Sequence, residues 1–162
     1  MLTYILWNKR CGQEAKNHIL HIGKNRERAL AQADDQEVLS DDDGLICEFS
    51  SIGCDDYAYC TQIDLSDDTK ELYFLKINES GGGGSYHSQI WLYVTETQEE
   101  IIDIAEAYFD NEHNRDSECD ECKNDSCRQN WIQELKETGI TAIECTTYEG
   151  ASFEMWRMKI GE

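Results

Sequence analysis

Short apolar stretches recur along the chain, and acidic or glycine-containing turns separate them. Most are rich in aromatic and β-branched residues, which predicts β-strands. The last two flank Glu149-Gly150 and predict a closing hairpin. The segments expected to be strands are 1–10, 45–49, 57–63, 72–77, 89–94, 140–147 and 153–160.

Two longer segments have the start signals and the apolar spacing of helices. Thr97-Gln-Glu-Glu100 is a capping box, in which the threonine and the glutamate each satisfy a backbone N–H at the helix start. Ser126-Cys-Arg-Gln129 has the same form, and Gly139 is placed to end that helix. A third helix is expected near Asn25. The apolar positions expected to face the core are Ile101, Ile104, Ala105 and Tyr108 in the first helix, Trp131 and Leu135 in the second, and Ala29, Leu30 and Ala33 in the third.

This order of elements predicts an α+β fold: a mainly antiparallel sheet of about five to seven strands with two or three helices packed on it. A length of 162 residues fits a single domain covering 1–162. The cysteine-rich stretch 113–127 would then connect two helices within that domain. Gly81 to Ser85 falls between two expected strands and predicts a hairpin loop, since it lacks the lysine and the spacing of a phosphate-binding loop.

The net charge restricts the possible functions of the chain more than any motif does. The chain has 14 Lys and Arg against 34 Asp and Glu, a net charge of −20. Such a surface repels nucleic acid and anionic membranes, so direct binding to either is not expected. The chain has no proline. It has no apolar run that could span a bilayer and no secretory signal at its start, which predicts a cytoplasmic protein. If a phage encodes the chain, this is the cytoplasm of the host cell.

The acidity is concentrated in the middle of the chain. Residues 1–30 carry six basic and two acidic side chains, whereas residues 31–125 carry four basic and 26 acidic ones. Many of the acids come in runs at expected turns, where short acidic side chains are locally favoured. A solvated surface explains these runs in part, but about 2–8 net charges keep a small domain soluble. The residues expected to bind a partner are Asp34, Asp35, Asp41, Asp42, Asp43, Asp55, Asp56, Asp67 and Asp68.

Three cysteines lie within nine residues, at Cys119, Cys122 and Cys127. A spacing of two residues between cysteines suits tetrahedral zinc, and a cysteine at a helix start favours the thiolate. We therefore expect one structural zinc ion, with His113 as a further ligand. Cys145 or His87 remain alternatives for the fourth ligand, and reduced thiols in a polar loop remain the alternative to a metal site.

Enzyme motifs are weak or fail. The cysteine pair lacks the proline and the His-x-Glu motif of a zinc deaminase. The acidic run 41–44 puts Leu39 and Ser50 where a calcium loop needs carboxylates. His18 and His21 stand among isoleucines and leucines, which is typical of partly buried histidines. A non-enzymatic protein is expected.

The leading hypothesis is an acidic inhibitor that binds a basic, nucleic-acid-handling protein and blocks its substrate site by nucleic-acid mimicry. Duplex DNA carries about 20 charges over ~34 Å, and a domain of this length spans roughly 40 Å. A phage anti-defence protein of the anti-CRISPR type and an immunity protein for a nuclease toxin are the settings that fit. The first alternative is a small zinc-stabilised protein-interaction module, and the second is a metal- or cysteine-dependent enzyme.

Overall fold

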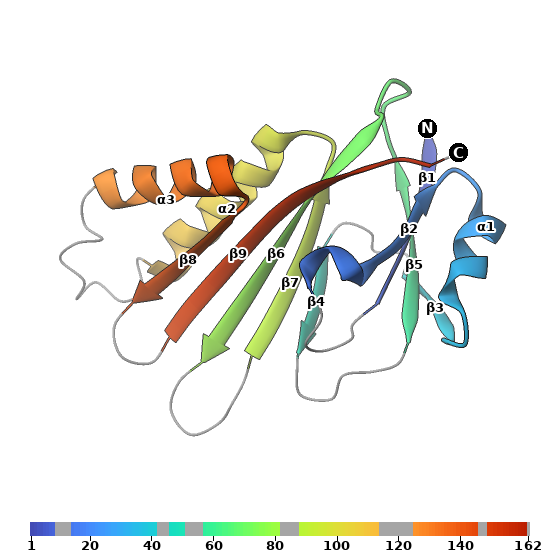
Figure 1. Cartoon of the computed structure of the whole chain (residues 1–162), viewed down its shortest axis with the longest axis horizontal. Helices are drawn as coiled ribbons and strands as arrows, with labels where there is room; N and C mark the ends of the chain where they lie inside the picture. Colours follow the sequence, from blue (N-terminus) through green and yellow to red (C-terminus); the bar gives the residue numbers. More distant parts are fainter. Residues whose placement is uncertain are drawn as a thin grey trace.

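The computed structural model describes residues 1–8, 14–41, 46–50, 57–81, 88–113, 125–145 and 149–161, which form two β-sheets with helices on their outer faces (Figure 1). Sheet A has the strand order β2-β1-β5-β3. Strand β1 is antiparallel to β2 and β5, and β3 is parallel to β5. The strands of sheet A are β1 (Leu2–Asn8), β2 (Ile19–Gly23), β3 (Val38–Asp41) and β5 (Ala58–Asp64).

Sheet B has the order β4-β7-β6-β9-β8, and all its neighbouring strands are antiparallel. Strands β6 and β9 are the longest and pair in unbroken register, from Glu71 opposite Lys159 to Gly81 opposite Glu149. The strands of sheet B are β4 (Ile46–Ser50), β6 (Glu71–Gly81), β7 (Ser88–Thr95), β8 (Ile140–Cys145) and β9 (Glu149–Lys159).

The helices are unequal in length. A short 3-10 helix, η1 (Ala15–His18), precedes β2, and α1 (Arg26–Leu30) continues into a second 3-10 turn, η2 (Ala31–Ala33). The two longer helices are α2 (Gln98–His113) and α3 (Asp125–Thr138), which lie together on one face of sheet B (Figure 1). Helix α1 and η2 cover the outer face of sheet A, where Ala29 and Ala33 are buried.

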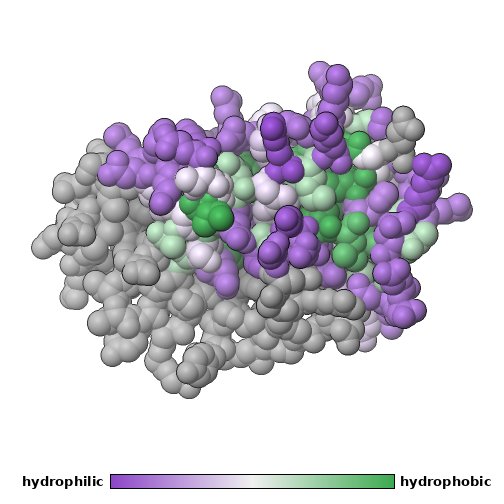
Figure 2. Space-filling model, viewed as in Figure 1, coloured by the Kyte–Doolittle hydropathy of each residue, from purple (hydrophilic) through white to green (hydrophobic). Residues whose placement is uncertain are grey.

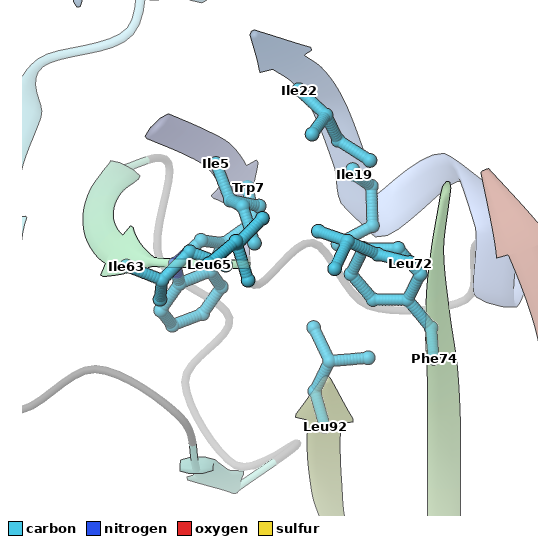
Figure 3. Close-up of a cluster of buried hydrophobic side chains, with 9 residues drawn as sticks. All are labelled: Ile5, Trp7, Ile19, Ile22, Ile63, Leu65, Leu72, Phe74 and Leu92. Atoms are coloured by element: carbon cyan, nitrogen blue, oxygen red, sulfur yellow. The ribbon is translucent and has the colours of Figure 1, made fainter. Parts of the chain in front are cut away.

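The two sheets share an inner core, in which side chains from β1, β2 and β5 meet those from β6 and β7 (Figure 3). Trp156 of β9 stacks on Phe74 with ring centroids 5.4 Å apart, which extends this core across sheet B. The residues of the inner core are Ile5, Trp7, Ile19, Ile22, Ile63, Leu65, Leu72, Phe74 and Leu92.

The opposite face of sheet B packs against α2 and α3. Successive side chains of a strand point to opposite faces, so Leu72 and Phe74 face sheet A while Leu75 and Ile77 face the helices. Phe153 is fully buried here, and Trp131 meets it edge-on at 4.7 Å. The residues of this outer core are Leu75, Ile77, Ile101, Ile102, Ala105, Trp131, Ile132, Leu135 and Phe153.

Several expectations are confirmed. The class is α+β and the sheets are mainly antiparallel. Thr97 and Glu100 form the capping box, with N–H to oxygen distances of 3.2 and 3.3 Å. Gly139 has a positive φ of 73° and its N–H donates to Leu135 at 2.9 Å, as a helix-ending glycine does. Asn25 caps α1 by accepting the N–H of Arg28.

Other expectations are wrong in detail. The described residues form nine strands in two sheets, where one sheet of about five to seven strands was expected. Strands β2 and β3 were not expected, because each is only four or five residues long and carries polar residues. Helix α3 begins at Asp125, so Ser126 lies inside it and is not its N-cap. Glu149 and Gly150 belong to β9 and do not form the hairpin turn.

Candidate functional site

Two connections meet at one end of the sheets and bring acidic side chains together. The turn between β5 and β6 contains Asp67 and Asp68, and the connection from β7 to α2 contains Glu96. The Glu96 carboxylate accepts the backbone N–H of Ser66 at 3.2 and 3.3 Å and also the hydroxyl of Thr69. These hydrogen bonds, that of Thr69 above all, lower the pKa of Glu96, so the turn is held by an ionised carboxylate.

The amino group of Met1 lies at the same end, beside the β5–β6 turn (Figure 1). It donates to Asp64 at 2.9 Å, also contacts the carbonyl of Leu65, and lies 3.3 Å from Asp67. The hydrogen bond to Asp64 raises the pKa of this amino group. Both carboxylates still face solvent, because the side chain of Asp64 is 84% exposed and that of Asp67 is 99% exposed.

The start of α2 adds further carboxylates beside Glu96. Glu99 and Glu100 lie in its first turn, where the helix dipole favours negative charge. Glu100 is engaged in the capping box, whereas Glu99 and Asp103 are exposed. We call this group the acidic end, and its members are Asp64, Asp67, Asp68, Glu96, Glu99, Glu100 and Asp103.

The acidic end can bind a cationic surface. Its carboxylates lie on turns and a helix start that rigid strands hold in place, so little order has to be gained on binding. Basic residues also lie beside the acidic end: Lys70 and Lys159 are exposed, and Arg157 pairs with Glu71 of β6 at 3.3 Å. Six of its seven acidic residues are exposed, and Glu96 is half-buried, so most of these carboxylates are available to a partner.

Asp34 and Asp35 lie at the opposite end of sheet A. They precede β3, whose first residue Val38 pairs with the first residue of β5, while Asp64 ends β5. A seven-residue strand is about 20 Å long, so this pair and the acidic end are separated by that length. Both residues are exposed, and Asp34 adopts a positive φ of 50°.

Of the remaining expected partner-binding residues, only Asp41 lies within the described residues. Asp41 is the last residue of β3, opposite Thr61 of β5. Asp42, Asp43, Asp55 and Asp56 lie outside the described residues.

The expected zinc ligands are placed by backbone only. His113 is the last residue of α2 and Cys127 lies in the first turn of α3, while Cys119 and Cys122 are outside the described residues. Within the described ranges no group of three or more potential metal ligands comes together. The zinc site therefore stays a prediction.

A second polar group lies between the sheets, and the sequence pattern did not indicate it. Lys76, in the middle of β6, is only 8% exposed, and His18 at the end of η1 is fully buried. The ring Nδ1 of His18 is 3.1 Å from the carbonyl oxygen of Asn8, which can only accept, so Nδ1 carries the proton. Burial first and the charge of Lys76 second lower the pKa of His18 to about 4. Burial lowers the pKa of Lys76, and Glu154 opposite it on β9 opposes that shift.

Sequence reasoning missed Glu96 and Lys76 for different reasons. Glu96 stands alone between two threonines, and only the fold reveals that it braces a turn 30 residues away. Lys76 interrupts an apolar strand, but both faces of β6 carry apolar residues, so the sequence pattern does not tell which face the lysine lies on. Neither residue belongs to a recognisable motif.

No helix in the described part of the chain has both the length and the apolar character needed to cross a bilayer. Comparisons with protein-family models, with curated proteins and with solved structures find no match to this chain.

Proposed function

We propose that this chain is a non-enzymatic acidic inhibitor, which binds a basic nucleic-acid-handling protein and occupies the site where that protein takes its substrate. The observation that carries the proposal is the distribution of charge. The chain has a net charge of −20, and none of the acidic residues whose exposure is described is buried. Many charges held on one surface destabilise a compact domain by repulsion, so their retention favours a role in binding.

The acidic end supplies the most organised part of this charge. Hydrogen bonds to Ser66 and Thr69 fix Glu96, and strands β5, β6 and β7 fix the neighbouring connections. A preorganised row of carboxylates can replace the phosphates of a nucleic acid in a channel lined by lysine and arginine. Phage anti-defence proteins and immunity proteins for nuclease toxins are the settings in which such an inhibitor would act.

The test begins with capture of partners from nuclease-treated host lysate, followed by measurement of affinity with the purified partner. The partner is expected to be a basic nuclease or defence effector. Saturating DNA or RNA should displace the inhibitor, and the affinity should fall steeply as salt rises. A confirmed partner that saturating nucleic acid fails to displace would overturn the mimicry.

Two matched double variants locate the binding surface. Asp67→Asn with Asp68→Asn neutralises the acidic end, and Asp34→Asn with Asp35→Asn removes the same charge about 20 Å away. All four side chains are exposed, so both variants should fold. We expect the first variant to weaken binding at least tenfold and the second to have the smaller effect. Equal, small losses in both variants would contradict a localised binding end.

A further inference from the structure

Strand β8 is an open edge of sheet B. Among the described residues it pairs with β9 alone, in continuous register from Ile140 opposite Glu154 to Cys145 opposite Glu149. It contains no lysine, no proline and no bulge, which are the features that usually protect an edge from pairing with another chain. Ile140 is 58% exposed, the largest exposure of any large apolar side chain among the described residues.

Alternate residues of β8 direct their backbone groups away from β9. Met155 donates its N–H to the carbonyl of Gly139 at 2.6 Å, which fixes the phase of the antiparallel ladder. Hydrogen-bonded and non-hydrogen-bonded pairs alternate along such a ladder, so every second residue bonds outward. The residues with outward N–H and C=O groups are Ile140, Ala142 and Glu144.

Only the first of these positions is occupied. The hydroxyl of Thr138 donates to the carbonyl of Ile140 at 2.7 Å and accepts its N–H at 3.2 Å. In the part of the chain that the structure describes, the outward groups of Ala142 and Glu144 have no backbone partner. Ala142 is exposed, so a second strand can approach there without displacing a large side chain.

The charge beside this edge is negative. Glu134 of α3 accepts the hydroxyl of Thr141 at 2.6 Å, which places its carboxylate against β8. Glu134 and Glu137 are exposed on the same helix, with Lys136 between them. An incoming strand that carries cations would therefore meet carboxylates on α3 as well as the overall charge of −20.

We infer that the open edge of β8 binds an extended, lysine- or arginine-bearing segment of a partner protein, which adds to sheet B as a further strand. Main-chain hydrogen bonds at Ala142 and Glu144 supply affinity, and the neighbouring carboxylates select a basic segment. Two copies of this chain would each bring −20 to the contact, so pairing of β8 with a second copy is disfavoured. The inference does not rest on the proposed function, because it concerns a different surface.

The probe is an eight-residue peptide of alternating lysine and valine, and the matched control alternates glutamate and valine. Binding is followed by NMR titration and by amide hydrogen exchange of the whole protein. The basic peptide should slow exchange of the Ala142 and Glu144 amides at least tenfold, and the acidic peptide should not. Equal binding of both peptides, or protection confined to other strands, would overturn the inference.

Three substitutions at one position separate backbone pairing from charge. Ala142→Pro removes an outward N–H but no hydrogen bond to β9, and should weaken the basic peptide at least tenfold. Ala142→Lys should also weaken it, whereas Ala142→Glu should leave binding equal or tighter. The lysine and glutamate variants keep the outward N–H and C=O groups of residue 142. Their opposite effects on peptide affinity therefore test the inference even if the proline variant does not fold.

Light scattering of the protein alone completes the test. We expect one species over the concentration range used for the titration. A concentration-dependent dimer that Ala142→Lys dissolves would assign the edge to a second copy and overturn the inference. Unchanged peptide affinity in all three variants would overturn it as well, and would leave the acidic end and its nucleic-acid competition unaffected.

Discussion

The two faces of sheet B bury similar apolar side chains but differ in the charge they contain. Toward α2 and α3, Leu75, Ile77 and Phe153 pack against apolar helix stripes, and no charged side chain of the described residues is buried there. Toward sheet A, the same strands bury Lys76, with His18 fully buried nearby. Among the coloured residues on the face drawn in Figure 2, hydrophobic side chains gather in small areas that hydrophilic side chains surround. Packing thus stabilises both layers, whereas pH acts through the inner one, where His18 is buried.

The buried charge of the inner layer is opposite in sign to the charge of the surface. The chain is strongly acidic, yet the one charged side chain found buried among the described residues, Lys76, is a cation. Removal of a charge from water is costly unless a partner compensates it, and Glu154 stands opposite Lys76 on β9. The exposed carboxylates need no such compensation, because water screens them. Negative charge is thus kept where a partner can reach it.

Truncation in the helix-side core should give the largest loss of stability. Phe153→Ala removes a fully buried ring that meets Trp131 and Tyr108 edge-on. We expect the free energy of unfolding to fall by about 3–5 kcal/mol, with similar loss at pH 5 and pH 8 because no titrating group is involved. Denaturant unfolding measures it, with Ser152→Ala as an exposed control on the same strand. A loss that depends strongly on pH would contradict the comparison.

Acid should weaken the inner layer through His18. Its pKa of about 4 in the folded protein lies below the usual 6.5, so the unfolded chain takes up the proton first as pH falls. Stability present above pH 6.5 is therefore lost progressively toward pH 4, by up to about 3 kcal/mol. His18→Asn keeps a donor for the carbonyl of Asn8 but does not titrate, so it should flatten this slope. An identical pH profile for both proteins would show that His18 does not control it.

Metal removal tests the expected zinc site in the cysteine-rich connection between α2 and α3. If zinc joins Cys119, Cys122 and Cys127 to His113, it closes a loop between α2 and α3. Chelation should then lower the stability by about 2–3 kcal/mol, the order expected when a loop of this length is released. Protein purified without chelators should contain about one zinc per chain, and Cys122→Ser should lose it. Absence of stoichiometric metal, with unchanged stability of this variant, would leave the cysteines as ordinary thiols.

Short-range sequence signals predicted the start of α2, its apolar face and the end of α3. The capping box at Thr97, the apolar stripe after it and the glycine that ends α3 are set within one or two turns of chain. The division into two sheets depends on contacts that no short window contains, such as Trp7 and Phe74 in one core. The acidic runs were visible in sequence, but their grouping required Glu96 to reach across 30 residues. The inward position of Lys76 also became clear only once the faces of β6 were known.

Removal of the helix cap should have a moderate effect. Thr97→Ala loses the hydroxyl that accepts the Glu100 N–H at 3.3 Å, and Glu100 keeps only its bond to the Thr97 N–H. We expect a loss of about 1 kcal/mol in the free energy of unfolding. Thr97→Ser retains the cap and should stay within a few tenths of the wild-type value. A loss as large as that of Phe153→Ala would mean that Thr97 supports more than the start of α2.

The smallest effect on stability should come from the acidic end, which makes it the sharpest contrast with the inner layer. Asp68→Asn and Asp103→Asn remove exposed charges that oppose their neighbours. Each should raise the free energy of unfolding by only a few tenths of a kcal/mol at low salt, because solvent screens exposed charges. The gain should vanish at high salt, where the Debye length falls to about 3 Å at 1 M. Denaturant unfolding at both ionic strengths measures this. A salt-independent loss of more than about 1 kcal/mol would show that these carboxylates hold the fold together, and it would remove the argument that they are kept for a partner.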